Sequence, residues 1–267
     1  MRSSDAIMAD LTESGIDGMS ERAWQCIDAA QVVVADLDGC LAQDNRPLDG
    51  AATFVRRTAG RLVVVSNNST HSAAALAELL RGRGLEIPAA RFVLAGELAV
   101  ATVAQRRPNA RMMLLGTQEI RKVAIQAGLR LVDETPDVVL LTRALDARVH
   151  DLEAAVTALH AGAMLVVANP DLSHPGAGGV PRIETGAILA LFKAVLPSTL
   201  SLVIGKPEVL LFQTALDLSG ARPDRAVMIG DNLTTDIAGA RRMGMHTIHL
   251  AGASVSPESV SVLARQE

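Results

Sequence analysis

The fold of this chain is decided by the stretch Val32-Val33-Val34-Ala35-Asp36-Leu37-Asp38-Gly39. Four apolar residues lead into two carboxylates and a glycine, which predicts a buried strand that ends in a polar turn. The same form recurs along the chain. Further apolar runs end at turn or polar residues, and they are Leu62–Val65, Phe92–Ala95, Met112–Leu115, Val138–Leu141, Leu165–Ala168, Leu202–Ile204, Ala226–Ile229 and Thr247–Leu250.

Segments of helical length, with apolar residues repeating at about 3.6 positions, separate these runs. They are Ser20–Ala30, Ser72–Arg83, Leu98–Arg106, Gln118–Ala127, Val149–Ala161, Gly186–Leu196 and Glu208–Leu218. Strands that alternate with helices predict an α/β fold with a doubly wound parallel sheet. Nine strands exceed one sheet of ordinary size, so we expect two α/β domains, with joints near Pro108 and Pro197–Ser201.

Composition excludes several classes of protein. Of the 267 residues 49% are hydrophobic, and the net charge is −4, so no broad basic surface for nucleic acid is expected. The apolar runs are too short to span a membrane, and Met1–Leu11 lacks the apolar segment of a signal peptide. Two cysteines, Cys26 and Cys40, cannot make a disulfide scaffold. We therefore expect a cytoplasmic protein without membrane or nucleic-acid partners.

Polar residues gather where four of the predicted strands end. In an open α/β sheet, ligands bind beyond the carboxyl ends of the strands, so these residues should converge on one crevice. Their carboxylates, hydroxyl, amides and ammonium suit a phosphate and a hard divalent cation. The four segments are Asp36–Leu41, Ser66–Thr70, Gly205–Pro207 and Gly230–Asp236.

Asp36 and Asp38 carry the expected chemistry. A carboxylate at a strand tip, such as Asp36, can attack phosphorus and form an aspartyl phosphate. The second carboxylate, Asp38, can protonate the leaving oxygen and then activate water. On its own, Asp-x-Asp-Gly is equally well a polar turn, and the other three segments decide against that interpretation. The nearby thiol of Cys40 is either inert and packed or open to inhibitory oxidation, with the first favoured.

The same carboxylates predict a Mg²⁺ site. Asp36, Asp231 and a main-chain carbonyl in the turn at Asp38 could hold the ion, with water and phosphate completing its ligands. Asp236 either supports these ligands without touching the metal or caps a helix, and both roles stay open. Asn232 is assigned the same supporting role.

Ser66, Asn67 and Asn68 are expected to begin a helix and to bind the phosphoryl group through free N–H groups and the serine hydroxyl. Plain N-capping is the commoner role for such residues, and the two roles are compatible. Lys206 would balance the charge of Asp36 and the phosphoryl group. The alternative is a solvated surface lysine, which its position at a third strand end makes less favoured.

These four segments, in this order, resemble the motifs of the haloacid dehalogenase superfamily. The long insertion between Ser66 and Lys206 resembles the α/β cap of class IIA, which includes p-nitrophenyl, pyridoxal and phosphoglycolate phosphatases. Three segments of the insertion resemble landmarks of the class IIA cap, and they are Val138–Thr142, Ala168–Asp171 and Glu184–Ala187. The resemblance implies the nucleophile, acid/base, phosphate, lysine and magnesium roles given above. It also implies a substrate contact for His174, for which a solvated loop residue is an equal alternative.

The resemblance further implies a discontinuous core, residues 1–108 and 201–267, with a cap at 109–200. Class IIA members often dimerise through the cap, and no residue here decides whether this chain does. We predict a Mg²⁺-dependent phosphomonoester hydrolase for a small phosphorylated metabolite, such as a polyol, sugar or glycolate phosphate. The alternatives are a phosphotransferase or mutase on the same core, and a phospho-ligand-binding module without turnover. The sequence does not name the substrate.

Overall fold

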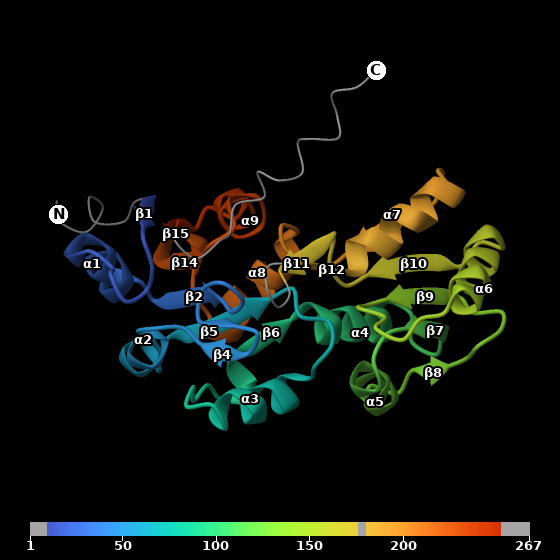
Figure 1. The fold of residues 1–267 in the computed structure, drawn as a ribbon, viewed down its shortest axis with the longest axis horizontal. Helices are drawn as coiled ribbons and strands as arrows, with labels where there is room; N and C mark the ends of the chain where they lie inside the picture. Colours follow the sequence, from blue (N-terminus) through green and yellow to red (C-terminus); the bar gives the residue numbers. More distant parts are fainter. Residues whose placement is uncertain (1–9, 176–179, 252–267) are drawn as a thin grey trace, which may run out of the picture.

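The computed structural model describes residues 10–175 and 180–251, and it places them around two parallel sheets that lie side by side (Figure 1). The first sheet has the strand order β1-β15-β14-β2-β5-β6, and every neighbouring pair in it is parallel. Its strands are β1 (Leu11–Glu13), β2 (Val32–Asp36), β5 (Leu62–Ser66), β6 (Phe92–Leu94), β14 (Ala226–Gly230) and β15 (His246–Leu250).

The second sheet has the order β13-β10-β9-β7-β8 and is also parallel throughout. Its strands are β7 (Arg111–Leu115), β8 (Arg130–Leu131), β9 (Val138–Leu141), β10 (Met164–Val167) and β13 (Ser201–Val203). Two antiparallel hairpins complete the described strands, β3 (Ala42–Gln43) with β4 (Arg46–Pro47) and β11 (Ser173–Pro175) with β12 (Pro181–Ile183).

Helices connect the strands, and side chains of the preceding residues fix where several of them begin. Ser20, Ser72 and Thr117 each accept a hydrogen bond from a backbone N–H in the first turn, which satisfies one of its free donors. The α-helices are α1 (Glu21–Ala29), α2 (Ala51–Thr58), α3 (Ala73–Arg81), α4 (Ala95–Arg106), α5 (Gln118–Gln126), α6 (Val149–His160), α7 (Thr185–Val195), α8 (Val209–Ser219) and α9 (Ala238–Arg242). Shorter helical turns are η1 (Ala89–Arg91), η3 (Pro223–Arg225) and the π-helix η4 (Leu233–Ile237).

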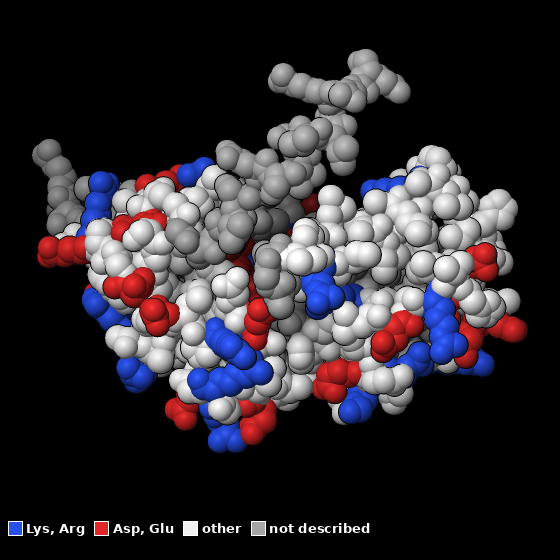
Figure 2. Space-filling view, viewed as in Figure 1, with Lys and Arg blue, Asp and Glu red and all other residues white. Residues whose placement is uncertain are grey.

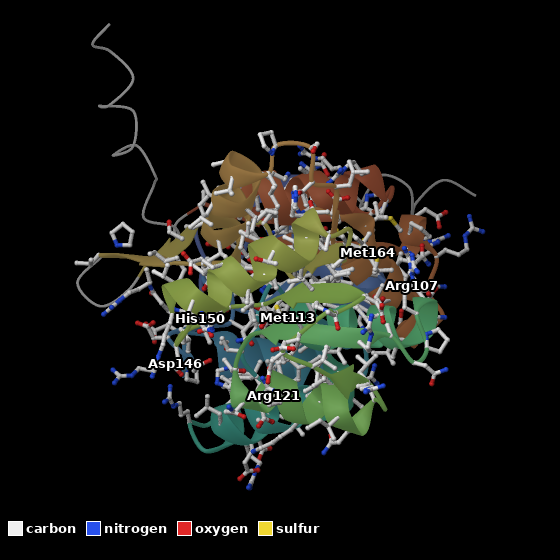
Figure 3. The ribbon with its side chains drawn as sticks, turned by 90° about the vertical axis from the view of Figure 1, so that its right-hand side faces the viewer. Arg107, Met113, Arg121, Asp146, His150 and Met164 are labelled. Atoms are coloured by element: carbon white, nitrogen blue, oxygen red, sulfur yellow. The ribbon has the colours of Figure 1, made fainter. Side chains whose placement is uncertain are left out.

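Both faces of the first sheet are buried at its centre, which explains why β2, β5 and β14 are apolar at nearly every position. Along β2, Val32 and Val34 pack toward α4 and α8, whereas Val33 and Ala35 pack toward α1, α2 and α3. The first of these clusters continues into the second sheet, so one apolar core joins the two halves. The far face of the second sheet packs against α6 and α7, and in the view onto this end of the molecule Met113 of β7 lies near the centre (Figure 3).

The α/β fold class and the parallel sheets are as predicted, and all nine predicted strands are present. One strand differs from the predicted domain division: β13 pairs with β10, so the boundary set between residues 200 and 201 cuts the second sheet. The short strands β1, β3, β4, β8, β11 and β12 and the helices α2 and α9 were not predicted. Residues 1–9 and 252–267 of the predicted core lie outside the described ranges.

The surface and the helices bear on the predicted partners. On the face drawn in Figure 2, Lys and Arg side chains lie interspersed with Asp and Glu. Among the described residues, every helix is too short or too polar to cross a bilayer.

Candidate active site

Lys206 and two aspartates form the centre of the site. Its ammonium Nζ lies 2.5 Å from Asp36 Oδ1, at the end of β2, and 2.7 Å from Asp236 Oδ1 in the π-helix η4. All three residues are buried, with Lys206 only 3% exposed. Burial alone would lower the pKa of Lys206, but Asp236 and Asp36 outweigh it and raise that pKa, so the ammonium stays charged. The interpretation of Lys206 as a solvated surface residue is therefore wrong.

Asp36, Asp231 and Asp236 form a cluster of carboxylates, with one oxygen from each lying within 4.8 Å of the others. Burial, followed by the charge of Asp236, raises the pKa of Asp36 well above its usual value, although Lys206 opposes this. The same two causes raise the pKa of Asp231 to about 6. Three acids held together against their mutual repulsion, with a single lysine, are an oxygen donor set that suits Mg²⁺. Asp38 does not belong to this cluster, and its predicted contribution through a carbonyl stays a prediction.

The turn after β2 fits tightly against Asp231. Gly39 has a φ of +82°, and a Cβ atom there would lie 2.3 Å from Asp231 Oδ2. Only glycine combines this backbone conformation with so close an approach. The turn that follows Asp36 therefore packs directly against the carboxylate of Asp231.

Asp38 projects from this turn and is exposed to solvent. Protein groups nevertheless surround its carboxyl closely enough that desolvation raises its pKa, against the charges of Lys206 and His174. An acid with a raised pKa keeps its proton to higher pH, which suits a proton donor.

Cys40 follows the same turn and is buried, with Sγ 3.7 Å from the carbonyl oxygen of Ile229. Burial and the charge of Asp36 raise the pKa of its thiol well above the usual value. A thiol that resists ionisation is poorly reactive, which favours the inert role over the redox-sensitive one.

The helix expected at residues 66–68 is absent, because α3 begins only at Ala73 and Ser72 caps it. Instead, Asn68 Oδ1 accepts hydrogen bonds from the N–H groups of Thr70 and His71 and closes a turn. Ser66 is buried at the end of β5, where its hydroxyl oxygen accepts from the Asn68 N–H at 3.0 Å and keeps its own proton to donate. Its role in phosphate binding stays a prediction.

The side chain of Asn67 makes contacts that the sequence analysis did not predict, and the phosphate role of Asn67 stays a prediction. Its Oδ1 accepts from the Lys206 N–H at 2.7 Å, and its Nδ2 donates to the Lys206 carbonyl at 3.1 Å and to Asp171 at 2.9 Å. Every polar atom of its side chain thus has a protein partner. The side chain orients Lys206 and joins the first sheet to the second, which leaves only its backbone N–H for phosphate.

Asp236 contacts both Lys206 and the residue that caps η4, and its supporting role at the metal stays a prediction. Its Oδ1 pairs with Lys206, while its Oδ2 accepts from the Asn232 N–H at 3.1 Å, at the start of η4. Asn232 is exposed and uses its side chain to cap this helix, through Thr234 and Thr235. These bonds fix the start of η4, and the supporting role of Asn232 at the site stays a prediction.

His174, which was predicted, lies beside residues that the sequence analysis did not single out, namely Arg143, Glu184, Ser69 and Asn169. His174 of β11 lies with Nδ1 2.8 Å from Glu184 Oε1, and Arg143 Nε lies 3.1 Å from the same oxygen. Buried Ser69, near Ser66, accepts from the Arg143 N–H at 3.0 Å and from Asn169 Nδ2 at 3.3 Å. The strand-end rule applied to β9 and β10 would have found Arg143 and Asn169, since each follows its strand closely. The substrate contact of His174 stays a prediction.

Known proteins match this chain over most of its length. Residues 33–130 match the family Haloacid dehalogenase-like hydrolase, and residues 203–265 match the family HAD-hydrolase-like. The acid sugar phosphatase of Staphylococcus epidermidis is 30% identical over 227 residues, which cover 82% of this chain and 86% of that protein.

Solved structures agree with these matches. The 4-nitrophenylphosphatase of Thermotoga maritima superposes with a TM-score of 0.80 at 27% identity, covering 87% of this chain and 90% of that one. The glycerol phosphate phosphatase of Mycobacterium tuberculosis, solved in complex with magnesium, superposes with a TM-score of 0.77 at 28% identity. The match covers 84% of this chain and 68% of that one. This chain therefore belongs to the haloacid dehalogenase superfamily, among its class IIA phosphatases.

Proposed function

We propose that this chain is a Mg²⁺-dependent phosphomonoesterase that hydrolyses a small phosphorylated metabolite through a phosphoryl group carried on Asp36. The observation that carries the proposal is the charge-paired centre in which Lys206 bridges Asp36 and Asp236 beside Asp231. The relatives named above are phosphatases of sugar, glycerol and nitrophenyl phosphates, which supports the substrate class.

The reaction follows from the positions of the two acids. Asp36 attacks phosphorus, the ester P–O bond breaks, and Asp38 gives its proton to the departing oxygen. Asp38, now a carboxylate, takes a proton from water as that water attacks phosphorus, which releases phosphate and restores Asp36. The raised pKa of Asp38 supports the first of these two roles.

Lys206 supplies fixed positive charge throughout. It balances Asp36 before the attack and can stabilise the charge that builds on the phosphoryl oxygens. Asp36, Asp231 and the carbonyl of Asp38 would hold Mg²⁺, with Asp236 behind them. When bound, Mg²⁺ would lower the repulsion within the carboxylate cluster and polarise phosphoryl oxygens.

The arrangement of the halves supports a catalytic core with an inserted cap. We propose that the second sheet and its helices are that cap, with the return to the core after Val203 rather than after residue 200. Dimerisation through this cap and a cytoplasmic location stay predictions.

Turnover assays test this proposal. The purified chain should hydrolyse p-nitrophenyl phosphate with added Mg²⁺, lose that activity in EDTA and regain it when Mg²⁺ is restored. Transfer of the phosphoryl group to added glycerol in excess of phosphate release would favour the phosphotransferase alternative. Binding of phosphate esters without turnover would favour the binding module.

A further inference from the structure

Arg143, His174 and Glu184 form a closed ring of contacts in the second half of the molecule. Glu184 Oε1 lies 3.1 Å from Arg143 Nε and 2.8 Å from His174 Nδ1, and Arg143 Nη2 lies 3.4 Å from His174 Nε2. The three come from separate elements: the loop after β9, the hairpin strand β11 and the residue before α7. The side chains of Arg143, His174 and Glu184 are 24%, 34% and 14% exposed, so the ring is partly buried and still accessible to solvent.

The contacts fix the protonation of the ring. A guanidinium only donates, so His174 Nε2 accepts from Arg143 Nη2, and the proton of the neutral imidazole is on Nδ1, which lies 2.8 Å from Glu184 Oε1. Burial and the charge of Arg143 lower the pKa of His174, in agreement with a neutral imidazole. The ring thus contains one cation, one anion and one neutral group. Three further charges act on the pKa of His174: Asp38 and Asp44 raise it, and Arg182 lowers it.

Hydrogen bonds join the ring to the loop after β5, which is predicted to bind the phosphoryl group. The Arg143 N–H donates to Ser69, and the Asn169 amide joins Ser69 to Thr185, the residue after Glu184. Ser69 belongs to the loop that begins at Ser66. The charge of Glu184 acts on the carboxyl of Asp38, and the charge of Asp38 acts on His174, which places the ring near the proposed proton donor. The group that Asp38 protonates is the leaving group of the ester.

We propose that the Arg143–Glu184 pair selects the leaving group, favouring an uncharged, hydroxylated one and disfavouring one that carries a carboxylate. This inference rests on the proposed function. The remaining N–H groups of Arg143 and the lone pairs of Glu184 offer donors and acceptors side by side, which suits hydroxyl groups, since each both donates and accepts. A carboxylate would have to share Arg143 with Glu184, whose like charge repels it.

The test compares kcat/KM for glycerol 3-phosphate and for 2-phosphoglycolate, with p-nitrophenyl phosphate as the measure of the chemistry itself. The wild-type chain should prefer glycerol phosphate. Glu184→Gln keeps the side chain's shape and its capping oxygen but leaves Arg143 unbalanced, so the ratio should move toward phosphoglycolate by about tenfold or more. Arg143→Gln leaves Glu184 unbalanced and should move the ratio the opposite way.

Asp137→Asn is the matched control, because it also removes the carboxylate partner of an arginine in the second sheet. It lies before β9, at the opposite end of the strand from Arg143, and should leave the ratio unchanged. An unchanged ratio in both ring variants, or a wild type that prefers phosphoglycolate, would overturn the proposal. If no phosphate ester, p-nitrophenyl phosphate included, is turned over by the wild type, the proposed function itself fails.

Discussion

The side-chain amide of Asn67 makes two hydrogen bonds with the backbone of Lys206: it accepts from the N–H at 2.7 Å and donates to the carbonyl at 3.1 Å. The two residues are 139 positions apart in the chain. The lysine that pairs with Asp36 is therefore held by the loop that follows β5, and not only by the turn after β13 in which it lies. The same amide donates to Asp171 beyond β10, so one side chain joins the loop after β5 to Asp171 and to Lys206.

From these two hydrogen bonds we predict that Asn67→Asp impairs catalysis without unfolding the protein. The aspartate can still accept from the Lys206 N–H but cannot donate to the Lys206 carbonyl or to Asp171, and it adds a negative charge. We expect kcat on p-nitrophenyl phosphate to fall by about tenfold to a hundredfold, because displacement of a charge-stabilising group acts on the transition state. Exposed Asn109, with a φ of +69°, provides the control Asn109→Gly, which should keep full activity. Equal kcat for both variants would contradict the positioning role.

Asp38→Asn should depend on the leaving group. A p-nitrophenolate needs little protonation, whereas an alkoxide needs it strongly, so the first step should slow far more for an alkyl phosphate. The second step also uses Asp38, to activate water, and this mutes the contrast at steady state. Burst kinetics isolate the first step. Equal losses in the burst rates of both esters would remove Asp38 from the role of acid.

Mg²⁺ should stabilise the folded chain, and this effect should weaken in acid. The pKa of Asp231 is raised to about 6, so below that pH a proton competes with the metal for its carboxylate. The increase in Tm on adding Mg²⁺ should be larger at pH 7.5 than at pH 5, as measured by differential scanning fluorimetry. Asp231→Asn should abolish most of the increase at both values. A Mg²⁺ effect that is equal at the two pH values would count against this site.

Asp137 offers a pH test of stability away from the active site. Hydrogen bonds from Arg111 lower the pKa of its carboxyl to about 2, from 3.8 for the free side chain. A lowered folded-state pKa stabilises the fold above the pKa of the unfolded chain, and this contribution is lost as pH falls through the folded-state value. Asp137→Asn should therefore lower the urea midpoint at pH 6 and lower it less at pH 3. Both groups of the pair are substantially exposed, so the effect should be small. A larger difference at pH 3 would contradict the sign.

The residues that sequence reasoning found share one feature. Asp36, Ser66 and Asp231 stand at or next to the ends of β2, β5 and β14, which are neighbours in the first sheet, so the topology of that sheet brings them together. Lys206 follows β13 of the second sheet, so its place beside Asp36 also depends on contacts between the two halves, such as those of Asn67. The helix expected at Ser66–Asn68 failed for a local reason, because the Asn68 side chain bonds the backbone of Thr70 and His71 and delays the helix to Ala73.

The residues that it missed depend on contacts across the chain. Glu184 matters because Arg143 and His174 reach it from two other elements, and no periodicity encodes that meeting. Likewise β1 is only three residues long and contains no apolar run, so its pairing with β15 is set by the sheet edge that it covers.

The central claim, a phosphoryl group carried on Asp36, is tested most directly by trapping. The chain is mixed with substrate and Mg²⁺, quenched in acid within the first turnover, and treated with borohydride, which reduces an acyl phosphate to an alcohol. Fragmentation of the peptide that contains Asp36 and Asp38 then locates the modified residue. The account predicts homoserine at position 36, dependent on substrate and absent from Asp36→Asn. Homoserine at another carboxylate, or an unmodified Asp36 during a full burst of product, would contradict it.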